Sequence, residues 1–279
     1  MTKGVVIFAQ NNKEIDYVEL AIYAAQQVKT YLSLPVTIIT DSKNWLEKAH
    51  SDKSSIFDSI IEVKDNSHQS KKFYDGISYK TDSWKNFTRF NVFHLSPYDE
   101  TLVIDSDYII NSNFLKFCWD QPQDFLIYDK NFDIAGWRDT SEFEFISEYS
   151  IKFYWATVFF FRKNKLNECF FNLIEHIKSN WIYYVKLYRL TSTKFRNDYA
   201  FSIAIHMMNG FIDDSFATPI PNKLSYVLDR DILIEHKNNK MKFLIQKQNK
   251  GDDFIAVSTR DLDVHVMNKH SLLRIIRNV

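Results

Sequence analysis

The sequence predicts an α/β fold, in which a mostly parallel central sheet is flanked by helices and followed by a C-terminal hairpin and tail. Three observations support this prediction. Apolar runs of strand length alternate with runs of helical periodicity through the first half. Further buried strands and amphipathic helices follow in the second half. Two alternating runs then meet at Asn238-Asn239 within residues 231–246, a pattern typical of a hairpin.

The first strands and the helix between them have clear patterns. Val5–Ala9 is an uncharged apolar run, as expected for a buried strand. Tyr17–Leu32 has apolar side chains at helical spacing. Pro35 then precedes a second strand at Val36–Thr40, and Ile60–Val63 predicts a short third strand. These elements form the start of a parallel sheet with its crossover helix.

A polar stretch separates this unit from the next strand. Residues 64–80 are rich in Asn, Ser, His and Lys, which predicts a loop. A helix is expected from about Asp82 to Leu95, capped by Asp82 or Thr81 and ended by Pro97. Thr101–Asp105 is apolar until its last residue and predicts a strand.

In the second half, the apolar runs Phe125–Tyr128 and Ala156–Phe161 predict buried strands. They are separated by residues 129–153, and a connection of that length is usually functional. Helices are predicted from Asn164 and over Asp198–Asn209. No repeat or linker interrupts the chain, so we expect a single domain over residues 1–279.

Composition excludes several classes of function. Lys and Arg total 35 and Asp and Glu total 35, so no global charge attracts nucleic acid, and none is expected as a partner. The 5 glycines do not cluster into a phosphate-binding loop. Cys118 and Cys169 are too few for a disulfide framework and are expected to be reduced core residues. The apolar run at the N-terminus is too short for a signal peptide, and none of the apolar stretches could span a bilayer, so we expect a cytoplasmic protein.

The strongest local signal is Asp105-Ser106-Asp107 at the end of an apolar strand. Ligands gather at the carboxyl ends of strands in open α/β sheets, and two carboxylates there can hold a hard cation such as Mg²⁺ or Mn²⁺. The alternative is an acidic loop. Lys85 and Arg89, four residues apart, would share one face of the preceding helix and suit a diphosphate; the alternative is a solvated helix face.

Several blocks of the sequence resemble the GT-A-fold glycosyltransferases, whose sheet is Rossmann-like, and especially glycosyltransferase family eight. The blocks are VVIFAQNN, YVELAIYAAQQV, LPVTIITD, ETLVIDSDYII after Arg89, NDYAFSIAIHMMNG and VHVMNK. They occur in the family's order over nearly the whole chain. The resemblance implies a nucleotide-sugar-binding half over residues 1–112 and an acceptor-binding half over residues 113–279.

The resemblance also implies roles for single residues. Asp105, Asp107 and His265 would hold Mn²⁺ or Mg²⁺ against the donor diphosphate. The donor would also be contacted by a set of polar residues, namely Gln10, Asn11, Tyr17, Asp41, Lys85, Arg89, Ser106 and Lys269. Asp198 resembles the acidic residue near the sugar and is, with Arg89, the candidate catalytic group; the alternative for Asp198 is a helix N-cap.

The chain departs from the family at two places. The string from His265 to His270 lacks the family's glycine, which makes His270 an alternative metal ligand and Lys269 an uncertain phosphate contact. Trp155-Ala156-Thr157 stands where close relatives have an Asn-(Ser/Ala)-Gly string, which affects the sugar pocket and the stereochemical class. Residues 137–139, Trp-Arg-Asp, are a candidate acceptor contact.

The resemblance implies metal-dependent transfer of a sugar, with a UDP-sugar as the favoured donor, to a hydroxyl acceptor such as a glycan. It favours retention of configuration. Two alternatives remain. One is a GT-A-like domain that binds a glycan or partner without turnover, and the other is a sugar nucleotidyltransferase, which usually has a Gly-rich loop where this chain has Gln10-Asn11-Asn12.

Overall fold

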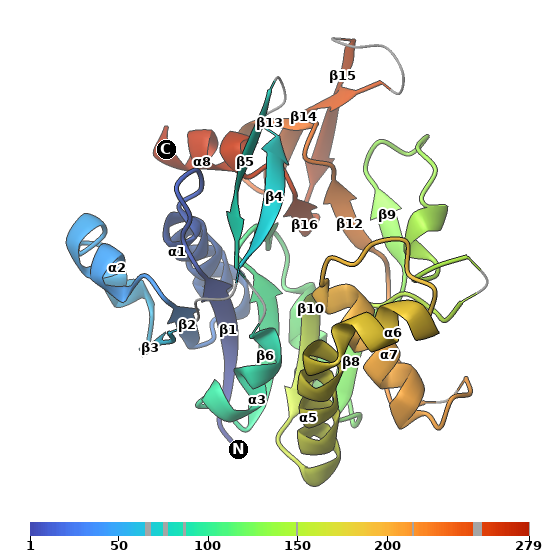
Figure 1. The fold of residues 1–279 in the computed structure, drawn as a ribbon. Helices are drawn as coiled ribbons and strands as arrows, with labels where there is room; N and C mark the ends of the chain where they lie inside the picture. Colours follow the sequence, from blue (N-terminus) through green and yellow to red (C-terminus); the bar gives the residue numbers. More distant parts are fainter. Residues whose placement is uncertain are drawn as a thin grey trace.

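The computed structural model describes residues 1–64, 68–74, 78–85, 88–148, 150–213, 215–247 and 253–278. Its centre is a seven-stranded sheet with the order β11-β8-β10-β6-β1-β2-β3 (Figure 1). β10 is antiparallel to both of its neighbours, whereas the other pairings are parallel. The mostly parallel α/β architecture is therefore confirmed. The strands are β1 (Lys3–Ala9), β2 (Val36–Thr40), β3 (Ser59–Glu62), β6 (Glu100–Asp105), β8 (Phe125–Tyr128), β10 (Trp155–Arg162) and β11 (Thr218–Pro219).

Helices flank this sheet. α1 packs against β1 and β2, and α7 packs against β10 and α5. The α-helices are α1 (Tyr17–Gln27), α2 (Lys43–Ala49), α3 (Val92–Leu95), α4 (Phe117–Asp120), α5 (Lys165–Ser179), α6 (Trp181–Leu187), α7 (Asn197–Met208) and α8 (Lys269–Arg277). Turns of π-helix or 3₁₀-helix are η1 (Val28–Leu32), η2 (Ser54–Ile56), η3 (Arg89–Asn91), η4 (Phe114–Lys116) and η5 (Ser141–Phe143), of which η1 is the π-helix.

Two smaller sheets are built largely from the second half of the chain. The first has the order β7-β16-β12-β9, and the second has the order β13-β14-β15. β13 and β14 are the predicted hairpin, which β15 extends. The bounds are β7 (Tyr108–Ile109), β9 (Asn131–Asp133), β12 (Leu224–Val227), β13 (Ile232–Lys237), β14 (Lys240–Gln246), β15 (Phe254–Arg260) and β16 (Val264–Val266).

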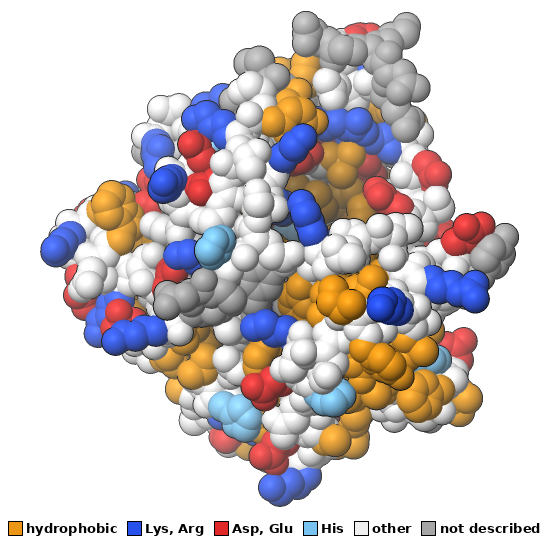
Figure 2. Space-filling view, viewed as in Figure 1, with side chains coloured by type: hydrophobic (Ala, Val, Ile, Leu, Met, Phe, Trp, Pro, Cys, Tyr) orange, Lys and Arg blue, Asp and Glu red, His pale blue; other side chains and the backbone are white. Residues whose placement is uncertain are grey.

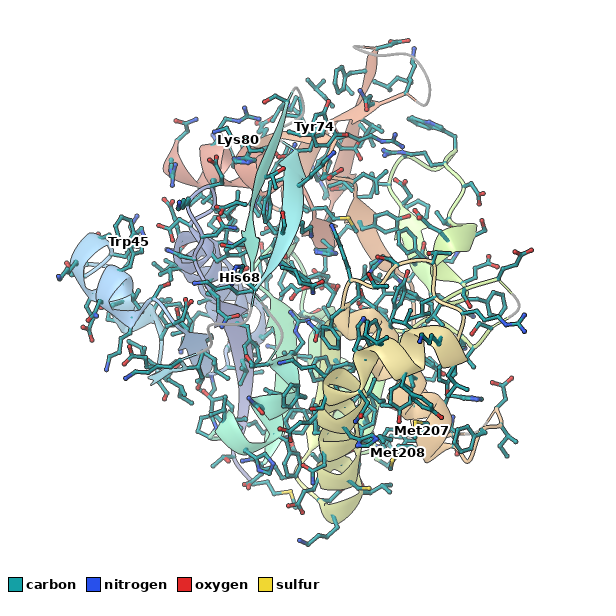
Figure 3. The ribbon with its side chains drawn as sticks, in the orientation of Figure 1. Trp45, His68, Tyr74, Lys80, Met207 and Met208 are labelled. Atoms are coloured by element: carbon teal, nitrogen blue, oxygen red, sulfur yellow. The ribbon has the colours of Figure 1, made fainter. Side chains whose placement is uncertain are left out.

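The expectation for residues 64–95 is wrong in two respects. A hairpin of β4 (Gln69–Tyr74) and β5 (Tyr79–Trp84) replaces part of the predicted loop and the start of the predicted helix (Figure 1). The rings of Tyr74 and Tyr79 stack 4.4 Å apart near its tip, where Tyr74 is labelled in Figure 3. Among the residues of this stretch that the structure describes, helical structure begins at Arg89. Residues 65–67, 75–77 and 86–87 of these predictions lie outside the described residues.

The other predicted elements match the structure closely. The helix α5 begins after Asn164, whose side chain caps it, and α7 is followed by Gly210 at φ +71°. Phe159, Phe160 and Phe161 are fully buried. Cys118 is also buried, but Cys169 is exposed, so the prediction that both cysteines lie in the core is wrong for Cys169. Within the described ranges, none of the helices is long and apolar enough to cross a membrane.

Candidate functional site

A cleft of about 500 Å³ lies at the carboxyl ends of β1 and β6, bordered by the β4–β5 hairpin, the segment before α7, and the start of α8. Figure 2 shows a hollow in this face, with Lys and Arg side chains around it. The cleft gathers most of the predicted site residues, although they come from distant parts of the chain. Those in its lining are Gln10, Tyr17, Lys85, Arg89, Asp105, Ser106, Asp107, Asp198, His265, Lys269 and His270.

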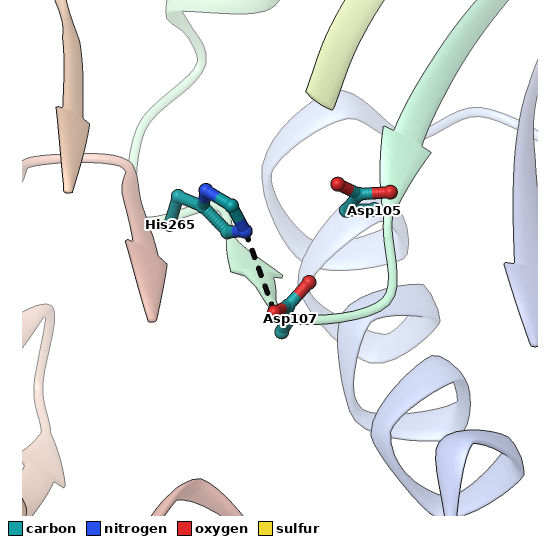
Figure 4. A group of neighbouring side chains, drawn as sticks. All are labelled: Asp105, Asp107 and His265. Atoms are coloured by element: carbon teal, nitrogen blue, oxygen red, sulfur yellow. Dashed lines mark ion pairs between the residues drawn. The ribbon is translucent and has the colours of Figure 1, made fainter. Parts of the chain in front are cut away.

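Asp105, Asp107 and His265 offer ligand atoms that all lie within 4.8 Å of one another (Figure 4). Asp105 ends β6, and Asp107 stands just before β7. β7 pairs with β16 so that Tyr108 lies opposite His265, which places the imidazole beside Asp107. Nε2 of His265 is 3.3 Å from Oδ2 of Asp107. The late histidine of the sequence thus reaches the carboxylates through strand pairing.

Two cations face these carboxylates. Arg89 is buried and donates to Oδ1 of Asp105 and to the carbonyl of Ala156, while Nζ of Lys269 is 2.5 Å from Oδ2 of Asp107. Burial by itself raises the pKa of Asp107, but the nearby Lys269 and His265 outweigh this effect and hold that pKa well below its usual range. Burial lowers the pKa of Arg89 to about 10, which leaves it cationic at neutral pH. The site is therefore a compact set of opposite charges.

Lys85 and Arg89 do not share a helix face, contrary to the sequence prediction. Lys85 follows β5, and Arg89 begins the turn η3. Nζ of Lys85 is 2.6 Å from Oδ2 of Asp41, and Lys85 lines the cleft. Asp41 is outside the described cleft lining, so the structure places it as the partner that holds Lys85.

Gln10 and Tyr17 lie at the end of the cleft where β1 leads into α1. Both polar side-chain atoms of Gln10, and the hydroxyl of Tyr17, are buried and make no hydrogen bond within the described residues. Burial raises the pKa of Tyr17. Because buried polar groups usually have partners, these two side chains suit a ligand that supplies hydrogen bonds. 

Asn11 has a different place from the one predicted. Its Oδ1 accepts a hydrogen bond from the backbone N–H of Val18, and its Nδ2 donates to Asp16, the N-cap residue of α1. It is absent from the described cleft lining. Asn11 therefore organises the turn into α1, next to Gln10.

Asp198 lies in the first turn of α7 and is not its N-cap, which is Arg196. Oδ1 of Asp198 accepts from the backbone N–H of Ala156 at 3.0 Å, and Oδ2 accepts from Arg196 at 3.1 Å. These bonds fix the carboxylate at the cleft. Ala156 also accepts a hydrogen bond from Arg89 at its carbonyl, so its peptide groups connect Asp198 to Arg89. The alternative of a helix N-cap is thus wrong.

The candidate acceptor contact at residues 137–139 is outside the described cleft lining. Arg138 is buried and pairs with Asp133 at 3.2 Å and with Asp231 at 2.7 Å. This cluster connects the segment after β9 to the C-terminal sheets. Its geometry indicates a structural role for Arg138.

Sequence reasoning missed several charged and aromatic residues of the cleft. Lys71 and Trp84 come from the β4–β5 hairpin, and Lys194 and Arg196 come from the segment before α7. The available signal for the hairpin was the aromatic residues that flank an Asp75-Gly76 dipeptide, which is typical of hairpin turns. No comparable pattern marks residues 192–196.

The donor set formed by two carboxylates and one imidazole fits a hard divalent cation such as Mg²⁺ or Mn²⁺. Nδ1 of His265 is buried without a hydrogen-bond partner in the part of the chain that the structure describes. His270 lines the cleft but lies outside this three-residue group. The geometry favours His265 over His270 as the third ligand.

No protein-family model matches the chain, and no curated protein matches its sequence significantly. Among solved structures, the chain is similar to the glycosyltransferase GlyE of Streptococcus pneumoniae, with 12% identity and a TM-score of 0.45 over 79% of this chain and 46% of GlyE. It is also similar to the galactosyltransferase LgtC in complex with donor and acceptor sugar analogues, with 12% identity and a TM-score of 0.44 over 72% of this chain and 70% of LgtC. The chain spans about half the length of GlyE. Both solved structures are glycosyltransferases, and at 12% identity the likeness concerns the fold alone.

Proposed function

We propose that this protein is a metal-dependent glycosyltransferase that moves a sugar from a nucleotide-sugar donor, with a UDP-sugar favoured, to a hydroxyl acceptor such as a glycan. One observation carries the proposal. Asp105, Asp107 and His265 converge at the carboxyl end of the sheet, with Arg89 and Lys269 against the two carboxylates. A metal site with adjoining cations suits a diphosphate leaving group.

In this proposal, Asp105, Asp107 and His265 would hold Mn²⁺ or Mg²⁺, which when bound supplies charge neutralisation for the diphosphate. Arg89 and Lys269 share that task from the two sides of the carboxylate pair. Because each is already ion-paired and largely buried, its charge is fixed in place before a donor arrives.

The base and ribose would lie toward Gln10 and Tyr17, whose buried polar atoms would gain hydrogen-bond partners. Lys85, held by Asp41, would add a positive charge at that end. The donor would then be bound mainly by residues 1–112 and the acceptor by residues 113–279. His265 and Lys269 belong to the second half, so the two halves would share the diphosphate site.

Asp198 is the proposed catalytic carboxylate. It would either accept the proton of the acceptor hydroxyl, as inversion requires, or orient the sugar, as in a retaining enzyme whose leaving phosphate takes the proton. The family resemblance favours retention. The hydrogen bond that Asp198 accepts from the backbone N–H of Ala156 fixes its carboxylate, which supports a positioning or proton-transfer role.

A thermal-shift screen tests the proposal. UDP, GDP, ADP, CDP and TDP are each added with and without Mn²⁺. Ligand at 100 times its dissociation constant stabilises the native state by about 2.7 kcal/mol. We expect one diphosphate, UDP first, to raise Tm strongly and only with the metal. If none raises Tm in folded protein, the donor-site proposal fails, and a domain that binds a glycan or partner without turnover becomes the better interpretation.

A further inference from the structure

The cleft contains more positive than negative side chains. Its lining includes seven Lys and Arg residues and five Asp and Glu residues. Four of the cations have a carboxylate partner within 4.0 Å, namely Lys85, Arg89, Arg196 and Lys269. Among the described residues, the other three form no such ion pair, namely Lys71, Lys72 and Lys194. The proposed function leaves these three lysines unused.

Lys71 differs from the other two in what surrounds it. Its ammonium lies 5.1 Å from the ring centroid of Trp84 and 5.9 Å from that of Phe73. Lys72 lies instead over Tyr79, and Lys194 donates to the carbonyl of Ser70 at 3.2 Å. The aromatic faces partly satisfy the charge of Lys71 while keeping it in the cleft.

Lys71 lines the same cleft as Lys269 and Asp107. The surrounding protein lowers the pKa of Lys71; desolvation is the main cause, and the like charge of Lys269 adds to it while Asp107 opposes that effect. An anion placed near both ammonium groups would stabilise their like charges. Lys71 and Lys269 approach the cleft from different elements, β4 and α8.

The hairpin that carries Lys71 is fixed across the cleft. The side-chain amide of Gln69 donates to the carbonyl of Phe195 at 3.2 Å and accepts from the N–H of Phe195 at 3.0 Å. Lys194 adds its bond to Ser70. These contacts tie β4 to the segment that leads into α7, and so set the position of the backbone at Lys71.

We propose that Lys71, presented by the β4–β5 hairpin, is an additional positioning residue for the donor diphosphate, and that Gln69 holds the hairpin in place. This inference rests on the proposed function. It assigns a role to the hairpin, which lies in a region that the sequence predicted to be a loop. Lys71 and Lys269 then contact the same anionic group from two sides.

Binding measurements separate this role from a structural one. Calorimetry in the presence of Mn²⁺ compares UDP, UMP and uridine, or the corresponding set if the screen selects another base. We expect Lys71→Ala to weaken UDP binding about tenfold, with uridine binding unchanged, because only the phosphates meet the ammonium. Lys71→Arg should restore UDP affinity to within about threefold. Lys80→Ala is the matched control, since Lys80 lies on β5, pairs with Glu14 at 2.8 Å, and is outside the described cleft lining (Figure 3).

Gln69→Ala tests the hold on the hairpin and should weaken UDP binding in the same direction by a smaller factor. If Lys71→Ala does not fold, judged by its thermal unfolding, Lys71→Gln takes its place. Wild-type protein that binds no nucleoside diphosphate would overturn the proposed function and this inference together. Wild-type protein that binds UDP, with Lys71→Ala equal to it, would overturn the inference alone.

Discussion

Buried Arg89 donates a hydrogen bond to the carboxylate of Asp105 at the end of β6. A second guanidinium nitrogen donates to the carbonyl of Ala156 on the neighbouring strand β10. The carbonyl and N–H of Ala156 thus bind Arg89 and Asp198, respectively. The first acidic residue of the metal group and the candidate catalytic carboxylate are therefore held by one continuous hydrogen-bonded chain.

Replacing Arg89 should affect both stability and binding. Arg89→Met leaves Asp105 without its cation and Ala156 without its donor, so we expect the free energy of unfolding to fall by about 3 kcal/mol. Urea unfolding measures this loss. The metal-dependent Tm shift with nucleoside diphosphate should disappear as well. The exposed Arg274, replaced by Met, is the control, and equal effects of the two substitutions would contradict the assigned role.

Metal binding should depend on Asp107 and His265. Asp107→Asn removes a charge from the three-residue group, so we expect Mn²⁺ affinity to fall by at least about tenfold, measured by calorimetry or by Mn²⁺ paramagnetic resonance. Asp52→Asn, at an exposed position, should leave it unchanged. His265→Gln should weaken binding and His270→Gln should not. The reverse order would make His270 the ligand.

Replacing Gln10 with Leu should change stability and ligand affinity in opposite directions. Its buried amide makes no hydrogen bond within the described residues. Gln10→Leu removes this unsatisfied group, so we expect the free energy of unfolding to rise by about 1 kcal/mol. Affinity for the nucleoside diphosphate should fall about tenfold, because the ligand loses that partner. Chemical unfolding and calorimetry test the two parts, and a variant that loses stability would contradict the interpretation.

Asp198→Asn tests the catalytic carboxylate. The Asn side chain keeps an oxygen that can accept from the N–H of Ala156, so the fold and the nucleotide affinity should be retained. We expect turnover of the sugar donor to fall about 100-fold or more. The assay follows release of nucleoside diphosphate, with calorimetry as the control for binding. Turnover within a few fold of wild type would exclude Asp198 as the acid–base or orienting group.

The environment of His236 should make the free energy of unfolding depend on pH. Its Nε2 lies 2.7 Å from Oδ1 of Asn111, which can only accept, so Nε2 carries the proton and Nδ1 accepts from the hydroxyl of Tyr23 at 2.5 Å. Burial lowers the pKa of this neutral imidazole below its ordinary 6.5. Below pH 6.5 the unfolded chain therefore binds a proton that the folded chain resists, so stability falls as the pH falls.

We expect His236→Gln to show a smaller loss of unfolding free energy between pH 7.5 and pH 5.5 than the wild type does, measured by urea unfolding at each pH. The exposed His94, replaced by Gln, serves as the control. A variant with an undiminished pH dependence would mean that other groups determine it.

The buried strands of the central sheet could be predicted from the sequence. β1, β2, β6, β8 and β10 are nearly uninterrupted apolar runs, since both of their faces are covered. β4 and β5 were missed because most of their side chains face solvent or the cleft, which leaves no apolar alternation to detect. The short strands β7, β9, β12 and β16 are too brief to show a period, and their pairing partners are distant in the sequence.

The acidic strand end at Asp105 and Asp107 can be recognised from the sequence, because a strand that ends in two carboxylates is a local pattern. Which other side chains reach these carboxylates depends on how the chain folds. The pairing of β7 with β16 brings in His265, and the hairpin brings Lys71 over the cleft from a region that read as loop. A local pattern depends only on neighbouring residues. The complete site, in contrast, depends on strand pairing and packing between segments more than 100 residues apart, and a short stretch of sequence gives no information about such contacts.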